Sequence, residues 1–391
     1  MNIALVTLVD ITGKSGQNIY SREVVSSLSR NENVDLHLIC PQPESEIPKT
    51  VRENVASFHF LPAKRNQDIV WHLSCQKQLF EKLLHIVRKH DVEGIVSTLK
   101  PSNVLPPLFS LVFGLPYVVL LEGRVSDEVE TTTQSKLASF IVGIVERLNL
   151  KTSNSVFVPY DELKNWISTE NLTTEKKVEV FKHAVNKNIQ KPIEKKEARR
   201  ELGFNEDIFL IGYVGSFKRY HCLEELIYST KKLIEKDFDV ELVMMGEGPE
   251  KEKIEMMCRK KKIDDYVRLT GFVPHEEIST YISACDTMYG VIDPDRSGSP
   301  MKVFEYLACS RPVVAYRSGD LRFIAEIDAG DLIDKRSRES VLRALEKHIR
   351  MEEEELMEMG KNGREYVMNY RTWDSLAEKI VKRISSATED G

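Results

Sequence analysis

Short runs of apolar and β-branched residues alternate along the chain with longer stretches in which apolar residues recur every three or four positions. The short runs are typical of buried strands, and the longer stretches are typical of helices that cover a sheet. In the first half, strands are predicted at 2–9, 34–40, 57–61, 94–98, 117–121, 155–159 and 177–181. Helices are predicted at 19–28, 68–90, 133–150 and 161–168. This alternation predicts a mostly parallel, doubly wound sheet, in which ligands bind beyond the carboxyl ends of the strands.

The same alternation begins again after a polar link at 187–200 that contains Pro192. Strands are predicted at 209–215, 240–245, 267–270, 286–292 and 312–316. Helices are predicted at 222–236, 249–262, from about 300 onward, and at 321–324, 341–350, 352–366 and 373–384. At 391 residues, the chain suits two domains of ordinary size. The fold class we expect is α/β, with two Rossmann-like, doubly wound parallel-sheet domains over residues 1–188 and 189–370.

The stretch 293–316 places a loop, a helix and a short turn between two predicted strands. Ser299 stands at the N-cap and Pro300 at the first helical position, where each residue type is favoured. The next amides, those of Met301, Lys302 and Val303, have no partner within the helix and carry the positive end of its dipole. With the Lys302 ammonium beside them, these amides form a candidate phosphate site.

Glu305 lies one turn into this predicted helix. A carboxylate there is badly placed to meet a phosphate but well placed to accept hydrogen bonds from sugar hydroxyls. A phosphate on the amides and a ribose on the carboxylate describe a nucleotide. The alternative interpretation of this stretch is an ordinary Ser-Pro cap followed by an ordinary first-turn charge.

The segment SPMKVFEYLACSRPVVA closely resembles the donor-binding segment of retaining glycosyltransferases of family 4, which have the two-domain GT-B architecture. The resemblance implies two Rossmann-like domains facing a central cleft, helix amides that hold the diphosphate of a nucleotide sugar, and Glu305 on its ribose. It also implies that a C-terminal helix at 371–391 packs back on the first domain. Many members carry a second glutamate eight residues earlier, where it holds the transferred sugar, and this chain has Ser297 there.

Residues 211–222, IGYVGSFKRYHC, predict a strand that ends at Gly215 and a loop with Lys218, Arg219 and His221. A glycine directly after a strand lets the backbone approach a ligand, and the cations offer counter-charge to a diphosphate. The stretch resembles the family's G-S-F-K-P-W-H-G variant, which makes Lys218 and His221 candidate phosphate contacts. A solvated basic loop is the alternative.

Two further turns follow in the order that the family shows. MMGEGP at 244–249 matches the turn whose glycine, here Gly246, approaches the nucleotide. TGFVP at 270–274 matches the segment whose backbone, here at Phe272 and Val273, receives the nucleobase. Each turn alone is an ordinary strand end. Their order and spacing before SPMKVFE give the resemblance its specificity, and it covers residues 205–325, approximately.

The acceptor side is expected in the first domain. The loop DITGKSG follows the first predicted strand, and the resemblance places its glycines, Gly13 and Gly16, at the cleft. A P-loop is disfavoured because Leu8 stands where that motif requires a glycine. Further acceptor-side candidates, which follow predicted strands, are Glu122, Arg124 and His183. His183 stands where the family usually has asparagine, and a structural role is its alternative.

Composition narrows the compartment and the partners. A formal net charge of −6 argues against a nucleic-acid binder. Six scattered cysteines without C-x-x-C spacing suggest neither a metal site nor a disulfide framework, so the cytoplasm is expected. No apolar run approaches the roughly 20 residues of a membrane span. The predicted helix 68–90 is basic and amphipathic, so it either covers the sheet or makes a peripheral membrane contact.

The resemblance implies a retaining transferase that moves a sugar from a nucleoside diphosphate sugar, with UDP or GDP as the nucleotide, to a glycan, lipid-linked or small-molecule acceptor. No metal or cofactor is expected, because Lys218, Lys302 and fixed amides would stabilise the leaving diphosphate. The alternatives are a GT-B sugar-nucleotide epimerase or hydrolase, and a non-catalytic homologue that binds nucleotide sugars.

Overall fold

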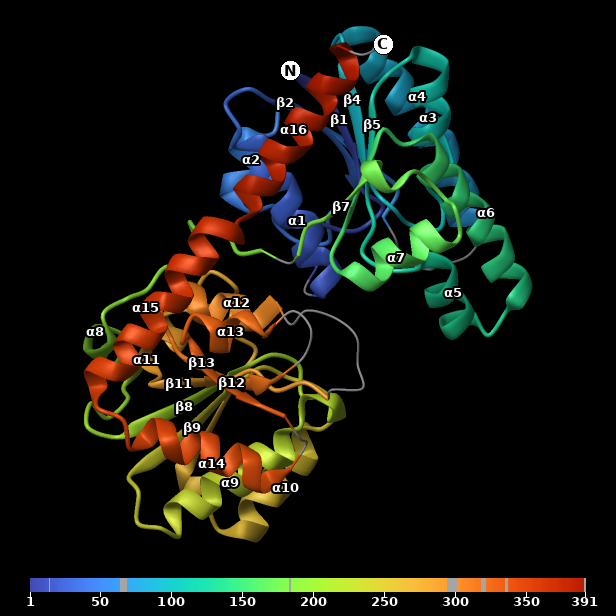
Figure 1. Ribbon diagram of the computed structural model, residues 1–391. Coiled ribbons are helices and arrows are strands. Elements are labelled where there is room, and N and C mark those ends of the chain that lie inside the picture. The colour runs from blue at the N-terminus through green and yellow to red at the C-terminus, as the bar shows by residue number, and fades with distance from the viewer. Residues whose placement is uncertain are drawn as a thin grey trace. The chain divides into compact units, whose positions relative to one another are not determined.

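The computed structural model describes residues 1–13, 15–63, 69–182, 184–293, 301–317, 321–334 and 337–389. Its contacts divide the chain into two compact units, which we call unit 1 (Met1–Lys182 with Trp373–Gly391) and unit 2 (His183–Thr372). The boundaries suggested by the sequence, at 188 and 370, differ from these by a few residues. Each unit is built around one parallel β-sheet covered by helices (Figure 1). The predicted fold class of two doubly wound α/β domains is confirmed.

The sheet of unit 1 has seven strands in the order β3-β2-β1-β4-β5-β6-β7. The strands are β1 (Asn2–Val6), β2 (Asp35–Pro41), β3 (Ser57–Leu61), β4 (Gly94–Thr98), β5 (Tyr117–Leu120), β6 (Ser155–Val158) and β7 (Val178–Val180). All pairs are parallel, and the central β1 sets Ile3 opposite Leu36 on one side and Gly94 on the other. Burial on both faces explains why these strands are continuous apolar runs.

The helices of unit 1 cover both faces of its sheet. They are α1 (Gly16–Ser29), α2 (Lys49–Asn54), α3 (Ile69–Lys89), α4 (Leu105–Phe113), α5 (Val125–Thr133), α6 (Lys136–Thr152), α7 (Asp161–Thr169), the 3-10 turn η1 (Glu175–Lys177) and α16 (Trp373–Glu389). Figure 1 shows α1, α2 and α16 on one side of the sheet and α3, α4 and α6 on the other. The last helix contacts α1, where Trp373 packs edge-on against Tyr20.

Unit 2 repeats the plan with six parallel strands in the order β10-β9-β8-β11-β12-β13. The strands are β8 (Phe209–Val214), β9 (Val240–Met245), β10 (Val267–Gly271), β11 (Thr287–Tyr289), β12 (Val313–Tyr316) and β13 (Gly330–Ile333). The helices are α8 (Lys195–Leu202), η2 (Arg219–His221), α9 (Leu223–Ile234), α10 (Lys251–Lys261), η3 (Asp264–Tyr266), α11 (Ile278–Ala284), α12 (Met301–Ala308), α13 (Phe323–Glu326), α14 (Arg338–Ile349) and α15 (Glu353–Tyr370).

Several elements differ from the sequence-based prediction. The first strand ends at Val6 and not at residue 9. Helix α5 begins at Val125, where no helix was predicted. The predicted helix 133–150 is instead α6, after a break at Gln134, which has a φ of 55°. The short elements α2, α4, α11 and β13 were not predicted. β13 starts at Gly330 with a φ of 154°, where a Cβ would lie 2.1 Å from the Val313 carbonyl oxygen, so its glycine belongs to the strand and not to a turn.

No helix within the described ranges is long and apolar enough to cross a membrane. All six cysteines are buried and free. Burial raises the pKa of several of these thiols, among them Cys285 to about 12, so they behave as small apolar core residues.

Candidate active site

The sequence motifs of unit 2 meet at one edge of its sheet. Gly215 follows β8, Gly246 follows β9, and Phe272 follows β10. Helix α12 lies between β11 and β12. Because β10, β9, β8 and β11 are neighbours in the sheet and all run in parallel, their carboxyl ends lie side by side. In a sheet of this kind that edge is where ligands bind.

Three glycines give this edge its backbone shape. Gly215, Gly246 and Gly271 have φ angles of 138°, 142° and 72°, a region that other residues rarely adopt. The Gly215 amide donates to the Met245 carbonyl (2.9 Å), and the Gly246 amide donates to the Gly271 carbonyl (2.8 Å). A Cβ on Gly246 would lie 2.1 Å from the Gly215 carbonyl oxygen, so the two turns are packed backbone on backbone.

The Lys302 ammonium lies against the Gly215 turn. Its Nζ donates to the Tyr213 hydroxyl (3.2 Å), lies 3.3 Å from Nδ1 of His221, and stands 4.4 Å from the centroid of the Tyr213 ring. A Cβ on Gly215 would lie 2.7 Å from that Nζ. Glycine at 215 therefore leaves the space that the lysine side chain occupies.

The surroundings of Lys302 change its protonation. Burial lowers the pKa of Lys302 to about 7, and the nearby carboxylate of Glu305 partly opposes this shift. Burial removes most of the water that would otherwise stabilise the ammonium. An anion that binds beside it would stabilise the charge in place of that water, so this lysine favours an anionic ligand.

Glu305 is held by side chains from the same unit. Its Oε1 lies 2.9 Å from Nε2 of His275, and this nitrogen also lies 3.1 Å from the amide nitrogen of Gln190. The carboxylate can only accept, so a hydrogen bond to Glu305 requires the proton on Nε2 of His275, and this nitrogen then cannot also accept from the Gln190 amide. The Glu305 side chain retains 13% of its exposure, so its carboxylate is positioned and not fully enclosed.

Helix α12 is joined to the sheet by a hydroxyl. Tyr306 is fully buried, and its oxygen accepts from the Val214 amide (2.8 Å) and donates to the Val214 carbonyl (3.1 Å). The bonds set the start of the helix against the end of β8, where Lys302 and Gly215 meet.

The other predicted donor residues are distributed as follows. Met301 is the first residue of α12 and Val303 is buried, with its amide in the first turn. Phe272 is half exposed at the end of β10, and Val273 beside it is half-buried. Lys218 is exposed, and its ammonium stands 5.8 Å from the centroid of the Tyr220 ring. The Lys218 carbonyl accepts from the His221 amide (3.0 Å), which joins its backbone to the residues around Lys302. Ser299 and Ser297 lie outside the described residues.

The acceptor-side candidates in unit 1 gather at the carboxyl edge of its sheet. Gly16 is the first residue of α1, which Ser15 caps, and not a loop residue. Gly13 lies in a turn, where its amide donates to the Asp10 carbonyl. The P-loop remains disfavoured, and Lys14 lies outside the described residues, as does His183.

Glu122 and Arg124 follow β5 at the same edge. Glu122 accepts from the Lys100 ammonium (3.1 Å), and burial raises the pKa of Glu122 although Lys100 opposes the shift. Arg124 is the N-cap of α5, pairs with Asp127 (2.9 Å) and lies over the Trp166 ring. Of the two, Glu122 has the environment of a proton-transfer group, whereas Arg124 is engaged in local structure.

Sequence reasoning missed Tyr213, Tyr306, His275, Gln190 and Lys100. The tyrosines resemble ordinary core residues within apolar runs, and Gln190 lies in a polar link. His275 directly follows TGFVP, and Lys100 lies two residues after the strand that ends at Thr98. Their position just after a strand was the sequence signal that could have identified both.

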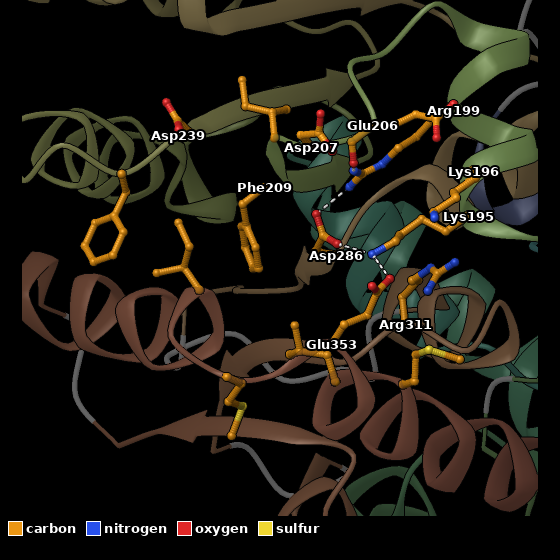
Figure 2. Close-up of a pocket in the computed structure, with 16 residues that line it drawn as sticks. Lys195, Lys196, Arg199, Glu206, Asp207, Phe209, Asp239, Asp286, Arg311 and Glu353 are labelled. Atoms are coloured by element: carbon orange, nitrogen blue, oxygen red, sulfur yellow. Dashed lines mark hydrogen bonds and ion pairs between the residues drawn. The ribbon is translucent and has the colours of Figure 1, made fainter.

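A pocket of about 460 Å³ lies at the opposite, amino-terminal edge of the unit 2 sheet. It is lined by residues that precede β8, β9, β11 and β12, and Figure 2 shows Asp286 between Arg199 and Lys195. Asp286 accepts from Arg199 (2.5 Å), Lys195 (2.9 Å) and the Leu210 amide (2.7 Å). Lys195 also pairs with Glu353. Asp286, Arg199, Lys195 and Glu353 neutralise one another in this pocket, so we assign this group of charges to the structure of the unit and not to the reaction.

Among the residues that the structure describes, no three His, Cys, Asp or Glu side chains are grouped as metal ligands would be. The candidate site in unit 2 is instead built from lysine, tyrosine and histidine side chains with the Glu305 carboxylate. The region in unit 1 has the Lys100 ammonium on the Glu122 carboxylate.

Comparison with known proteins agrees with the geometry. Residues 194–366 match the family model described as "Glycosyl transferases group 1", which spans most of unit 2. The capsular polysaccharide biosynthesis glycosyltransferase CapM of Staphylococcus aureus is 26% identical over 351 residues, 87% of each chain. These matches support a GT-B glycosyltransferase.

Solved structures with the GT-B fold are similar to this chain over nearly its full length. HepE from Anabaena in complex with UDP has a TM-score of 0.76 at 13% identity and covers 99% of this chain and 100% of its own. Sucrose-phosphate synthase from Thermosynechococcus elongatus has a TM-score of 0.71 at 17% identity and covers 100% of both chains. At sequence identities this low, the structural similarity shows the fold of the chain and nothing further.

Proposed function

We propose that this chain is a retaining glycosyltransferase of family 4 that moves a hexose from a UDP or GDP sugar to a glycan, lipid-linked or small-molecule acceptor. The observation that carries the proposal is the Lys302 ammonium held against the Gly215 turn, with Glu305 one helical turn further on. The names of CapM and of HepE in complex with UDP support the class of reaction and the class of donor.

In this proposal the donor diphosphate lies on the first amides of α12 beside Lys302, and the ribose lies on Glu305. As the bond from the anomeric carbon to the diphosphate breaks, its electron pair moves to the leaving phosphate oxygen. Fixed cations and amides stabilise that charge without reorganisation. The acceptor hydroxyl forms the new bond on the same face, and its proton passes to the leaving diphosphate. The stereochemistry rests on the family resemblance alone.

We also propose that the reaction takes place in the cytoplasm and uses no metal or cofactor. The free, buried cysteines fit a reducing compartment. A chelator is expected to leave the transfer rate unchanged, and a rate that depends on an added divalent cation would contradict this part of the proposal.

Replacing Glu305 with alanine is expected to weaken binding of a ribonucleoside diphosphate by about 1.5–3 kcal/mol, because the ribose loses a charged acceptor. Calorimetric titration with UDP and with its 2′-deoxy analogue measures the effect. The loss should be smaller for the deoxy compound, which offers the carboxylate one hydroxyl fewer. His275→Ala is the matched control: it removes the partner of Glu305 but keeps the carboxylate, so a smaller loss is expected. Equal affinities for wild type and Glu305→Ala would remove Glu305 from the site.

Donor affinity is expected to fall as pH rises above 7. Free Lys302, with a pKa of about 7, loses its proton there, whereas an adjacent diphosphate raises the pKa again. Binding at higher pH then takes up a proton, and affinity falls by up to about tenfold per pH unit. Titration of an intact sugar nucleotide between pH 6 and 8.5, in two buffers of different ionisation enthalpy, measures both affinity and proton uptake. Lys302→Arg stays charged throughout, so its profile should be flat; a flat wild-type profile would refute the assignment.

A donor assay without acceptor separates the transferase from an epimerase or hydrolase. The transferase consumes sugar nucleotide at a substantial rate only when an acceptor is added, whereas the other two enzymes turn it over alone. A non-catalytic homologue binds the sugar nucleotide, shown as a rise in thermal stability, but yields no product with any acceptor.

A further inference from the structure

Helix α6 of unit 1 exposes an apolar stripe. Leu137, Phe140, Ile141 and Ile144 follow the spacing of one helical face, and each is more than half exposed. The opposite face of α6 is buried against the unit through Gly143, Glu146, Asn149 and Leu150. The helix is thus held by a mixed polar and apolar inner face, while its most hydrophobic face points to solvent.

Helices α3 and α4 extend the same feature. On α4, Leu108, Leu111, Val112 and Phe113 are exposed, and on α3 Phe80 is exposed where it packs edge-on against Phe109. These three helices hold all nine exposed large hydrophobic residues found in the described part of unit 1. We call these nine residues the apolar face.

The three helices form one layer. Their connections run from β3 to β4, from β4 to β5 and from β5 to β6, in the same direction across the sheet. Right-handed crossovers in one direction place their helices on the same side. Helix α4 contacts both α3 and α6, and Figure 1 shows all three on the side of the sheet away from α1, α2 and α16. The apolar face is therefore spread over one side of unit 1.

The charge of this layer is opposite to that of the whole chain. Helices α3, α4 and α6 contain seven lysines and arginines and two glutamates, whereas the chain has a net charge of −6. Four exposed lysines make no ion pair with any side chain that the structure describes: Lys77, Lys89, Lys136 and Lys151. Glu146 is buried, where it accepts from the Val125 amide and the Ser126 hydroxyl.

Two of the three acidic residues of the adjoining helix α5 are engaged elsewhere, and the third, Glu130, is exposed. Asp127 pairs with Arg124, and Glu128 accepts from Gln17 of α1 (3.3 Å). Arg147 of α6 lies 3.7 Å from Glu170, with both side chains about half exposed. The unpaired cations of the layer therefore outnumber its free anions.

We propose that the layer of α3, α4 and α6 is a docking surface for an anionic lipid bilayer, with the apolar face inserted at the boundary between headgroups and acyl chains. Exposed apolar side chains flanked by unpaired lysines have the pattern of helices that lie in a membrane interface. A second copy of the chain fits less well. A two-fold contact would bring the same lysines together, and lysine is depleted in protein interfaces.

Flotation of the full chain with vesicles tests the proposal. We expect binding to an equimolar mixture of phosphatidylglycerol and phosphatidylcholine, and at least tenfold weaker binding to pure phosphatidylcholine. The triple variant Phe140→Ser, Ile141→Ser, Ile144→Ser should bind the anionic vesicles at least tenfold more weakly than wild type. A lysine variant, Lys89→Gln with Lys136→Gln and Lys151→Gln, should lose the preference for phosphatidylglycerol.

The matched control is Met256→Ser with Met357→Ser, which removes two exposed apolar side chains of unit 2 and should bind as wild type. The melting temperature of each variant and its affinity for a sugar nucleotide should remain unchanged, so failure of this proposal is distinguishable from failure of the proposed transferase. Absent wild-type binding, equal binding to both vesicles, or equal binding by the triple variant would overturn the proposal. A wild-type dimer that the triple variant turns into a monomer, without vesicle binding, would assign the surface to self-association and overturn it as well.

Discussion

Replacing Lys302 with methionine is expected to lower the turnover number by about 10²–10³-fold, the usual cost of removing one fixed donor from developing charge. Methionine keeps an unbranched side chain of similar length, so the packing against Tyr213 and the Gly215 turn should persist. The lost group is the ammonium that lies 3.2 Å from the Tyr213 hydroxyl. Transfer rates at saturating sugar nucleotide, measured for wild type and variant, give the ratio.

The stability of this variant separates a lost function from a lost fold. The pKa of Lys302 in the folded chain lies below its ordinary value, so the buried charge destabilises the fold most below pH 7, and the cost declines as pH rises. Lys302→Met should therefore melt at the same or a higher temperature than wild type at pH 6. A lower melting temperature, or an unchanged turnover number, would contradict the role that we give to Lys302.

Replacing Asp286 with asparagine is expected to destabilise unit 2 by about 3–5 kcal/mol, because Arg199 is then left buried without its counter-charge. Arg199 is almost fully buried, and its guanidinium also donates to the Ala284 and Glu206 carbonyls. Native-state hydrogen exchange of β8, whose Leu210 amide donates to Asp286, measures the loss locally. Exchange suits a two-unit chain because it needs no two-state transition.

The double variant Arg199→Met, Asp286→Leu provides the comparison. It removes both charges and replaces them by apolar groups of similar size, so its loss should be much smaller than that of Asp286→Asn. If β8 is protected from exchange in Asp286→Asn at least as well as in the double variant, the Arg199–Asp286 pair does not stabilise the amino-terminal edge of the sheet. The same result would reopen the neighbouring pocket to a functional interpretation.

The fold could be predicted from the sequence because a parallel sheet buried on both faces requires uninterrupted apolar runs, and such runs are easily recognised in the sequence. The strand-ending glycines were equally visible, since a turn that packs backbone on backbone, as at Gly246, tolerates no other residue. Elements governed by tertiary contacts were missed. Helix α4 has Pro106 and Pro107 in its first turn, and two adjacent prolines resemble a loop in sequence. Strand β13 is too short for its pattern to be recognised.

The candidate site was predictable in position but not in its contacts. Lys302 and Glu305 follow from the first turn of one helix, whereas their partners lie far away in the chain: Tyr213 is 89 residues from Lys302, and His275 is 30 residues from Glu305. Only the order of strands in the sheet brings these side chains together. The sequence left open whether the basic loop is solvated, as it is at Lys218, and it gave no sign that Lys302 would be buried.

The Tyr306 hydroxyl, which accepts from and donates to the Val214 backbone, has a consequence for how a donor is bound. Helix α12 cannot slide or rotate along β8 without breaking both bonds in a place where water cannot replace them. The start of α12 is therefore already in position before a sugar nucleotide binds. Little of its binding free energy is therefore needed to order the protein. In Tyr306→Phe both hydrogen bonds are lost, so ordering α12 would weaken binding although the residues in contact with the ligand are unchanged.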